Sequence, residues 1–169
     1  MQNRTFKKIT IWLGLCLALA GSATAQSTAT NEHKGQGYGF AAPVVTNSGD
    51  AGLQIGGGGE RLIYRGLGAG AEVSYLGTVR GLRDGFGVFS PNVSYHFLSA
   101  TKSGKWVPFV TGGYTLYFRS GVAHGFNFGG GVNYWFKERV GLRFEARDQV
   151  FANNGAAHLV SLRAGISFR

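Results

Sequence analysis

The sequence predicts an all-β fold, an eight-stranded antiparallel up-and-down transmembrane β-barrel, and its C-terminal part provides the strongest evidence. Residues 126–136 and 140–150 each alternate between two faces, and the polar residues 137–139 separate the two runs, which is the pattern of a β-hairpin. In the second run Arg143, Glu145 and Arg147 share one face, while the opposite face is apolar. One face of this hairpin is therefore charged and the other is not.

Aromatic residues indicate which of these faces points outward. Tyr134, Trp135 and Phe136 lie beside the charged break, which is typical of the aromatic girdle at the surface of a membrane. We therefore predict that the apolar faces contact lipid and that the charged faces point into the lumen. After residue 25 the sequence has no run of 18 apolar residues, so a membrane-spanning chain would have to form a closed barrel, in which every backbone group has a partner.

The first 25 residues have the features of a secretory signal peptide. Arg4, Lys7 and Lys8 precede an apolar segment at residues 9–20, and small residues at positions 23–25 provide a cleavage site. Residues 26–35 are expected to form a flexible lead-in, and residues 36–169 the barrel. The single cysteine, Cys16, lies in the signal segment, so no disulfide is expected after export.

The basic charge of the chain belongs in part to this signal segment. The formal net charge is +9, and loss of the three cations Arg4, Lys7 and Lys8 lowers it to +6. We interpret the remaining cations as lumen and rim charges. Nucleic acid is not expected as a partner, because an exported chain rarely meets it.

The predicted strands follow in order along the chain. They cover residues 36–44, 52–65, 69–76, 86–97, 105–118, 126–136, 140–150 and 158–168. The glycine run at 56–59 is expected to let a small barrel bend and to leave room for bulky lumen side chains. A tight turn is expected at 66–68. Pro91 cannot donate a hydrogen bond to the ladder of the fourth strand, so we expect a β-bulge there.

Two features of the predicted barrel bear on its function. The loops, at about residues 46–51, 77–85, 119–125 and 151–157, are short, so adhesion is expected less here than in barrels with long loops. Eight strands enclose a space that side chains fill, so no wide aqueous pore is expected. Alternation places six charged residues in that space, and isolated charges there would be costly, so we predict that they form an ion-pair network. These residues are Glu60, Glu72, Arg143, Glu145, Arg147 and Arg163.

The chain resembles the small outer-membrane β-barrels of the OmpA and OmpX kind. The resemblance covers about residues 35–169 and rests on GLRFEARDQV in the seventh strand, VPFVTGGYTLYF in the fifth and LVSLRAGISFR at the end of the chain. It implies a location in the outer membrane, contact with lipid and lipopolysaccharide, and insertion by the outer-membrane assembly machinery. That machinery reads a terminal strand that ends in an aromatic residue, here Phe168, although Arg169 follows it. We expect no periplasmic domain after the barrel.

Catalytic and ligand-binding chemistry is weakly represented in the sequence. The histidines, His33, His96, His124 and His158, lack the spacing of metal ligands, so neither a metal nor a cofactor is expected. Ser94 and His96 lie two apart on one strand, and they keep open a lipid A-modifying barrel enzyme. A soluble periplasmic ligand-binding barrel is the other alternative. The favoured hypothesis is a monomeric, non-enzymatic barrel with a role in envelope integrity or surface interaction, and with minor passage of small solutes if the lumen pairs rearrange.

Overall fold

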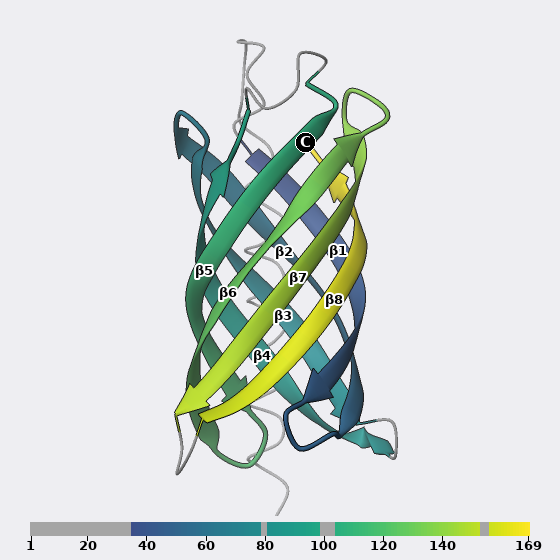
Figure 1. Ribbon diagram of the computed structural model, residues 1–169, viewed down its shortest axis with the longest axis vertical. Coiled ribbons are helices and arrows are strands. Elements are labelled where there is room, and N and C mark those ends of the chain that lie inside the picture. Colours follow the sequence, from purple (N-terminus) through teal and green to yellow (C-terminus); the bar gives the residue numbers. More distant parts are fainter. Residues whose placement is uncertain (1–34, 79–80, 99–103, 153–155) are drawn as a thin grey trace, which may run out of the picture. The chain divides into compact units, whose positions relative to one another are not determined.

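The computed structural model describes residues 35–78, 81–98, 104–152 and 156–169, and these residues form a closed antiparallel barrel of eight strands (Figure 1). Each strand pairs with the next along the chain, and β8 closes the barrel on β1. The predicted fold class is confirmed. The strands are β1 (Gly35–Thr46), β2 (Ala51–Tyr64), β3 (Leu67–Thr78), β4 (Gly81–His96), β5 (Trp106–Phe118), β6 (Val122–Trp135), β7 (Val140–Ala152) and β8 (Ala156–Phe168). None of the described residues belongs to a helix long and apolar enough to cross a membrane.

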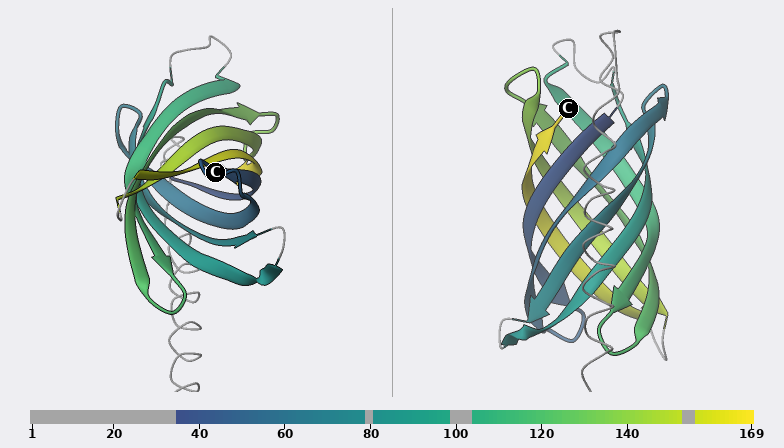
Figure 2. Two further views of the ribbon diagram at one scale, coloured as in Figure 1. Left: turned by 60° about the horizontal axis from the view of Figure 1, so that its bottom comes forward. Right: turned by 180° about the vertical axis from the view of Figure 1, so that it is seen from behind.

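The strands are tilted and wind around a common axis (Figures 1 and 2). The two ends of the barrel differ in which connections they hold. The start of β1, the end of β8 and the connections β2–β3, β4–β5 and β6–β7 lie at one end, which we call the turn end. The ends of β1, β3, β5 and β7 and the starts of β2, β4, β6 and β8 lie at the other end, which we call the loop end. The predicted signal peptide and nearly all of the predicted lead-in lie outside the described residues, and Gly35 already belongs to β1.

The β2–β3 turn is tighter than predicted. It consists of Arg65 and Gly66, with φ angles of 43° and 92°, and Leu67 already begins β3. Two consecutive positive φ angles are typical of the hairpin turns whose twist matches the strands. A side chain at Gly66 would also clash, because its Cβ would lie 2.3 Å from the carbonyl oxygen of His96.

The strands also extend further toward the loop end than predicted. The segment at 77–85 falls largely within β3 and β4, β6 begins at Val122, and β7 and β8 extend to Ala152 and from Ala156. Polar and glycine-rich composition led to the longer loops in our prediction. In a closed barrel such residues still gain ladder hydrogen bonds from a neighbouring strand on each side, so the strands continue through them.

The predicted bulge at Pro91 is wrong. Pro91 faces Ala71 of β3, and the register is the same on both sides of it. On the β5 side the register is also unchanged between the pairs Phe89↔Leu116 and Asn92↔Gly113. Proline removes one donor, and the strand tolerates this loss without inserting a residue. The register shifts instead near the ends of the barrel, between Leu62 and Tyr64 and between Leu76 and Thr78.

The polarity of the barrel is inverted relative to that of a soluble protein. Large apolar side chains cover the outer face, where Ile63 is 67% and Leu162 64% exposed. Among the buried side chains of the interior, polar and charged ones outnumber apolar ones. Exposed aromatic residues lie toward both ends of the outer face: Tyr64, Tyr95, Phe97, Trp106, Phe136 and Phe168 at the turn end, and Tyr75, Phe118 and Phe126 toward the loop end. This is the arrangement of a barrel that spans a membrane.

One residue of the predicted girdle lies elsewhere. Phe136 is exposed, and Tyr134 is half-buried on the outer face, where its ring packs against Trp106 at 4.4 Å. Trp135 is only 5% exposed and lies inside the barrel. It shares the inward parity of Asn127 and Asn133 in β6, so an unbroken aromatic triplet on an alternating strand cannot all face lipid.

Candidate functional site

The barrel interior brings the six predicted charges into one chain of contacts. At its centre Glu72 of β3, 1% exposed, accepts hydrogen bonds from Arg163 Nη1 of β8 at 2.8 and 2.9 Å. Arg147 Nη1 of β7 donates to the same carboxylate at 3.3 Å, as does the hydroxyl of Tyr38. Glu72 of β3 therefore connects that strand across the lumen to β1, β7 and β8.

Glu145 connects the two arginines that flank it on β7. It accepts hydrogen bonds from Arg147 Nε at 2.5 Å and from Arg143 at 3.1 and 3.2 Å. Arg163 Nη1 lies 4.0 Å from the same carboxylate. Alternation along one strand places all three side chains on the inward face. The carboxylate of Glu145 lies between the two cations, so their close approach is favourable.

Glu60 of β2 extends the network toward the turn end. Its carboxylate lies 3.6 Å from Arg143 Nη1 and 2.9 Å from His96 Nε2. Ser94 Oγ donates to it at 2.6 Å, and Gln36 Nε2 donates to its other oxygen. The sequence of contacts Glu60, Arg143, Glu145, Arg147, Glu72, Arg163 thus runs along the lumen without a break.

Aromatic rings support the arginines, and sequence reasoning missed this part of the site. The guanidinium of Arg143 lies 4.3 Å from the ring centroid of Tyr38 and 3.9 Å from that of Phe109. Arg163 lies 4.4 Å from the ring of Phe40. Such contacts stabilise a cation most strongly where water is excluded. The signal was present in β1, where the bulky residues Tyr38 and Phe40 alternate with the glycines at 35, 37 and 39.

The glycine run of β2 makes room for these rings. A Cβ at Gly58 would lie 2.9 Å from the ring of Tyr38 and 2.7 Å from the carbonyl oxygen of Ala71. The expectation that these glycines leave space for bulky lumen side chains is confirmed at this position.

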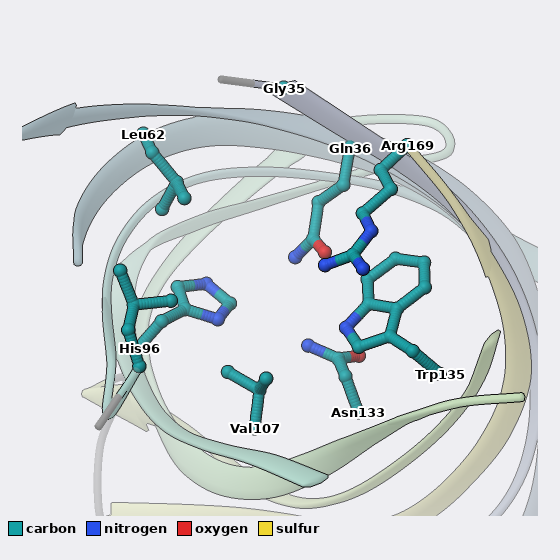
Figure 3. Close-up of a pocket in the computed structure, with 9 residues that line it drawn as sticks. Gly35, Gln36, Leu62, His96, Val107, Asn133, Trp135 and Arg169 are labelled. Atoms are coloured by element: carbon teal, nitrogen blue, oxygen red, sulfur yellow. The ribbon is translucent and has the colours of Figure 1, made fainter. Parts of the chain in front are cut away.

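The two ends of the lumen differ in polarity. At the loop end Val44, Leu76, Val88 and Tyr117 form a buried apolar cluster, against which Ala123, Phe151 and Leu159 pack. At the turn end the lumen has a small open cavity whose walls include His96, Asn133, Trp135 and Arg169 (Figure 3). Apolar packing therefore fills the loop end, and ion pairs fill the middle.

The arrangement of Ser94 and His96 differs from that of a nucleophile and its base. Both side chains contact Glu60, so the carboxylate lies between the hydroxyl and the imidazole. A serine nucleophile needs the imidazole in the middle position, where it can accept the hydroxyl proton. Both residues are also buried in the lumen, away from the lipid-facing surface.

The other histidines lie apart from the lumen network. On the outer face His124 Nδ1 bonds the hydroxyl of Tyr114 at 2.5 Å, and His158 Nδ1 lies 2.8 Å from Asp148. His33 is outside the described residues. In the part of the chain that the structure describes, no three His, Cys, Asp or Glu side chains are grouped so that they could hold a metal ion.

Comparison with known proteins identifies the fold. No protein-family model and no curated protein sequence matches this chain. Solved structures do match it. The N-terminal β-barrel domain of Pseudomonas aeruginosa OprF is 16% identical, with a TM-score of 0.58 over 80% of this chain and 98% of that domain. Neisserial surface protein A is 18% identical, with a TM-score of 0.60 over 79% of this chain and 94% of that one.

The fold is that of the small outer-membrane β-barrels. An outer-membrane enzyme, PagL, has it too, at 15% identity and a TM-score of 0.53 over 78% of this chain and 99% of the enzyme. A surface protein and an enzyme share this fold, so the fold by itself does not assign a role. The role has to be argued from the side chains of this barrel.

Proposed function

We propose that this protein is a non-enzymatic, monomeric barrel of the outer membrane whose role is structural, in the integrity of the cell envelope or in interaction at its surface. Export by the segment at residues 1–25 and insertion by the assembly machinery through Phe168 belong to this proposal. Outer-membrane lipid and lipopolysaccharide are its proposed contacts. The single observation that carries it is the inverted polarity, with exposed apolar side chains outside and a paired charge network inside.

The filling of the lumen supports a structural role over transport. Glu72, Arg147 and Arg163 are each at most 4% exposed, and both arginines bond to Glu72 across the central space. The apolar cluster at the loop end adds a second obstruction. A solute would have to break ion pairs in a space with little water, which is unfavourable, so passage of small solutes is at most a minor activity.

The geometry around Glu60 gives no support to the enzyme alternative, because Ser94 and His96 contact the carboxylate and not each other. The soluble barrel alternative would require the apolar face to be buried. It is instead exposed on the outside of the strands.

A gel-mobility experiment tests the proposal. We expect the protein folded in detergent to migrate as a compact species unless it is boiled, and to be rich in β-sheet by circular dichroism. Added to planar lipid bilayers, it should produce no large, long-lived conductance steps. A protein that is folded, soluble and monomeric without detergent would refute the membrane assignment, and stable channel currents would refute the closed lumen.

A further inference from the structure

The cavity at the turn end of the lumen borders the ion-pair network, because Gln36 and His96, which contact Glu60, line one side of it. Its volume is about 40 Å³, and it is open to the outside of the barrel. Residues of β4 and β6 and the residue after β8 meet in it (Figure 3). One water molecule needs about 10–15 Å³ of such space. The cavity therefore accepts only a group of a few atoms, with the rest of a ligand in the open mouth.

The side chain of Asn133 offers an unused donor to this cavity. Asn133 is 1% exposed, and its Oδ1 accepts a hydrogen bond from Ser167 Oγ at 3.4 Å. This contact turns the amide nitrogen toward the cavity (Figure 3), and Nδ2 has no hydrogen-bond partner among the described residues. A buried donor without an acceptor is unfavourable, so the site favours a ligand that supplies one.

Arg169 and Trp135 add further donors beside Asn133. The guanidinium of Arg169 lies 4.2 Å from the ring centroid of Trp135, and its Nε donates to the carbonyl oxygen of Glu138 at 2.8 Å. The structure gives the two Nη groups no hydrogen-bond partner within the described residues. A guanidinium edge matches the two oxygens of a carboxylate. The indole nitrogen of Trp135, which is a donor only, faces the same space (Figure 3).

The remaining walls determine what else the ligand can carry. Leu62 and Val107 are apolar and line the cavity together with these donors. The carboxylate of Glu60 next to the cavity already contacts Gln36, Ser94 and Arg143, so its charge is compensated. The carboxylate of Glu138 attracts the guanidinium of Arg169, but Glu138 is exposed and solvent screens its charge. We propose that this cavity binds the carboxylate of a small aliphatic acid between Arg169 and Asn133, with the short hydrocarbon chain against Leu62 and Val107.

Fluorine NMR of the full chain labelled with 5-fluorotryptophan tests this site. The chain has three tryptophans, whose resonances are assigned by replacing each in turn with phenylalanine. Acetate and propionate, titrated at constant ionic strength against sodium chloride, should shift the Trp135 resonance saturably. Half-saturation is expected on the order of 10 mM, because a ligand with so few heavy atoms makes few contacts. Trp106, which lies on the outer face, is the internal control and should not move.

Three variants separate a site from a general effect of charge. Asn133→Leu and Arg169→Gln should each weaken propionate binding by about tenfold, because each removes a donor to a charged ligand. Arg61→Gln removes an exposed cation of β2 near the same end and should change the affinity by less than about twofold. Heat-modifiable mobility shows that each variant is folded. An equal shift with chloride or acetamide, or an Arg61→Gln effect as large as that of Arg169→Gln, would overturn the proposal.

Discussion

Replacement of Glu72 by glutamine is the most direct test of the lumen network. The change keeps the shape of the side chain and, among the residues that the structure describes, removes the only negative charge within hydrogen-bond distance of Arg163. Arg147 keeps its contact with Glu145 at 2.5 Å, whereas the nearest oxygen of Glu145 is 4.0 Å from Arg163. Arg163 is therefore the group that Glu72→Gln leaves without a close counter-charge.

The expected loss follows from the remaining partners of Arg163. Removal of one member of a buried ion pair typically costs about 3–5 kcal/mol of unfolding free energy. Arg163 retains hydrogen bonds to Gln54 at 3.2 Å and to Ser161 at 3.3 Å, and it retains the ring of Phe40. These contacts compensate part of the charge of Arg163. We therefore expect the unfolding free energy to fall by about 3 kcal/mol, at the lower end of that range.

Urea titration of the barrel folded in lipid vesicles, with the band shift on heating as the readout, measures this loss. Glu138→Gln is the matched control, because Glu138 is exposed in the β6–β7 turn and its carbonyl oxygen, not its carboxylate, accepts from Arg169. It should change the stability by less than about 0.5 kcal/mol. The double variant Glu72→Gln/Arg163→Gln should be less destabilised than the sum of the two single changes. A loss below about 1 kcal/mol for Glu72→Gln, the size of an exposed pair, would refute the reasoning.

Two further predictions concern the barrel wall. Gly58→Ala should lower the unfolding free energy by about 1–3 kcal/mol, because the new methyl group would press on Tyr38 and on the backbone of Ala71, whereas Gly59→Ala, whose nearest contact would be 3.7 Å, should cost less than that in the same urea titration. Phe168→Ala should reduce the amount of folded barrel in outer-membrane fractions while leaving refolding in detergent intact, which a heat-modifiability assay on both samples would measure; equal loss in both would assign Phe168 to stability and not to assembly.

Period-two alternation was enough to predict the fold and the inward position of the network. Arg143, Glu145 and Arg147 lie two residues apart on a strand without a bulge. They therefore share one face of the sheet whichever register the strand adopts. Glu72 and Arg163 follow from the same rule in their own strands. The arginine partners of Glu60 and Glu72 could not be predicted, because they lie on strands far apart in the sequence.

The errors in the loop bounds and at Pro91 have a common physical origin in the closure of the barrel. Both edges of every strand are paired, so glycine-rich segments that would form loops elsewhere continue as strands, and Pro91 loses a donor without breaking the register. The error about Trp135 has a different origin, because the girdle was predicted from the position of the three aromatic residues beside the charged turn. Trp135 lies inside, because parity and not hydrophobicity decides the face on which a residue lies.

The interior network also provides a reason for a unique strand register. In a membrane, lipid is about as apolar as the side chains that face it, so the outer face discriminates little between alternative registers. A slip of β7 by one residue would turn Arg143, Glu145 and Arg147 outward. Each arginine near the middle of the bilayer would then cost about 2–4 kcal/mol. The pairs from Glu72 to Arg147 and Arg163 hold that face inward by joining β3 to β7 and β8 across the lumen. The contribution of the network to specificity is therefore independent of whether it adds net stability.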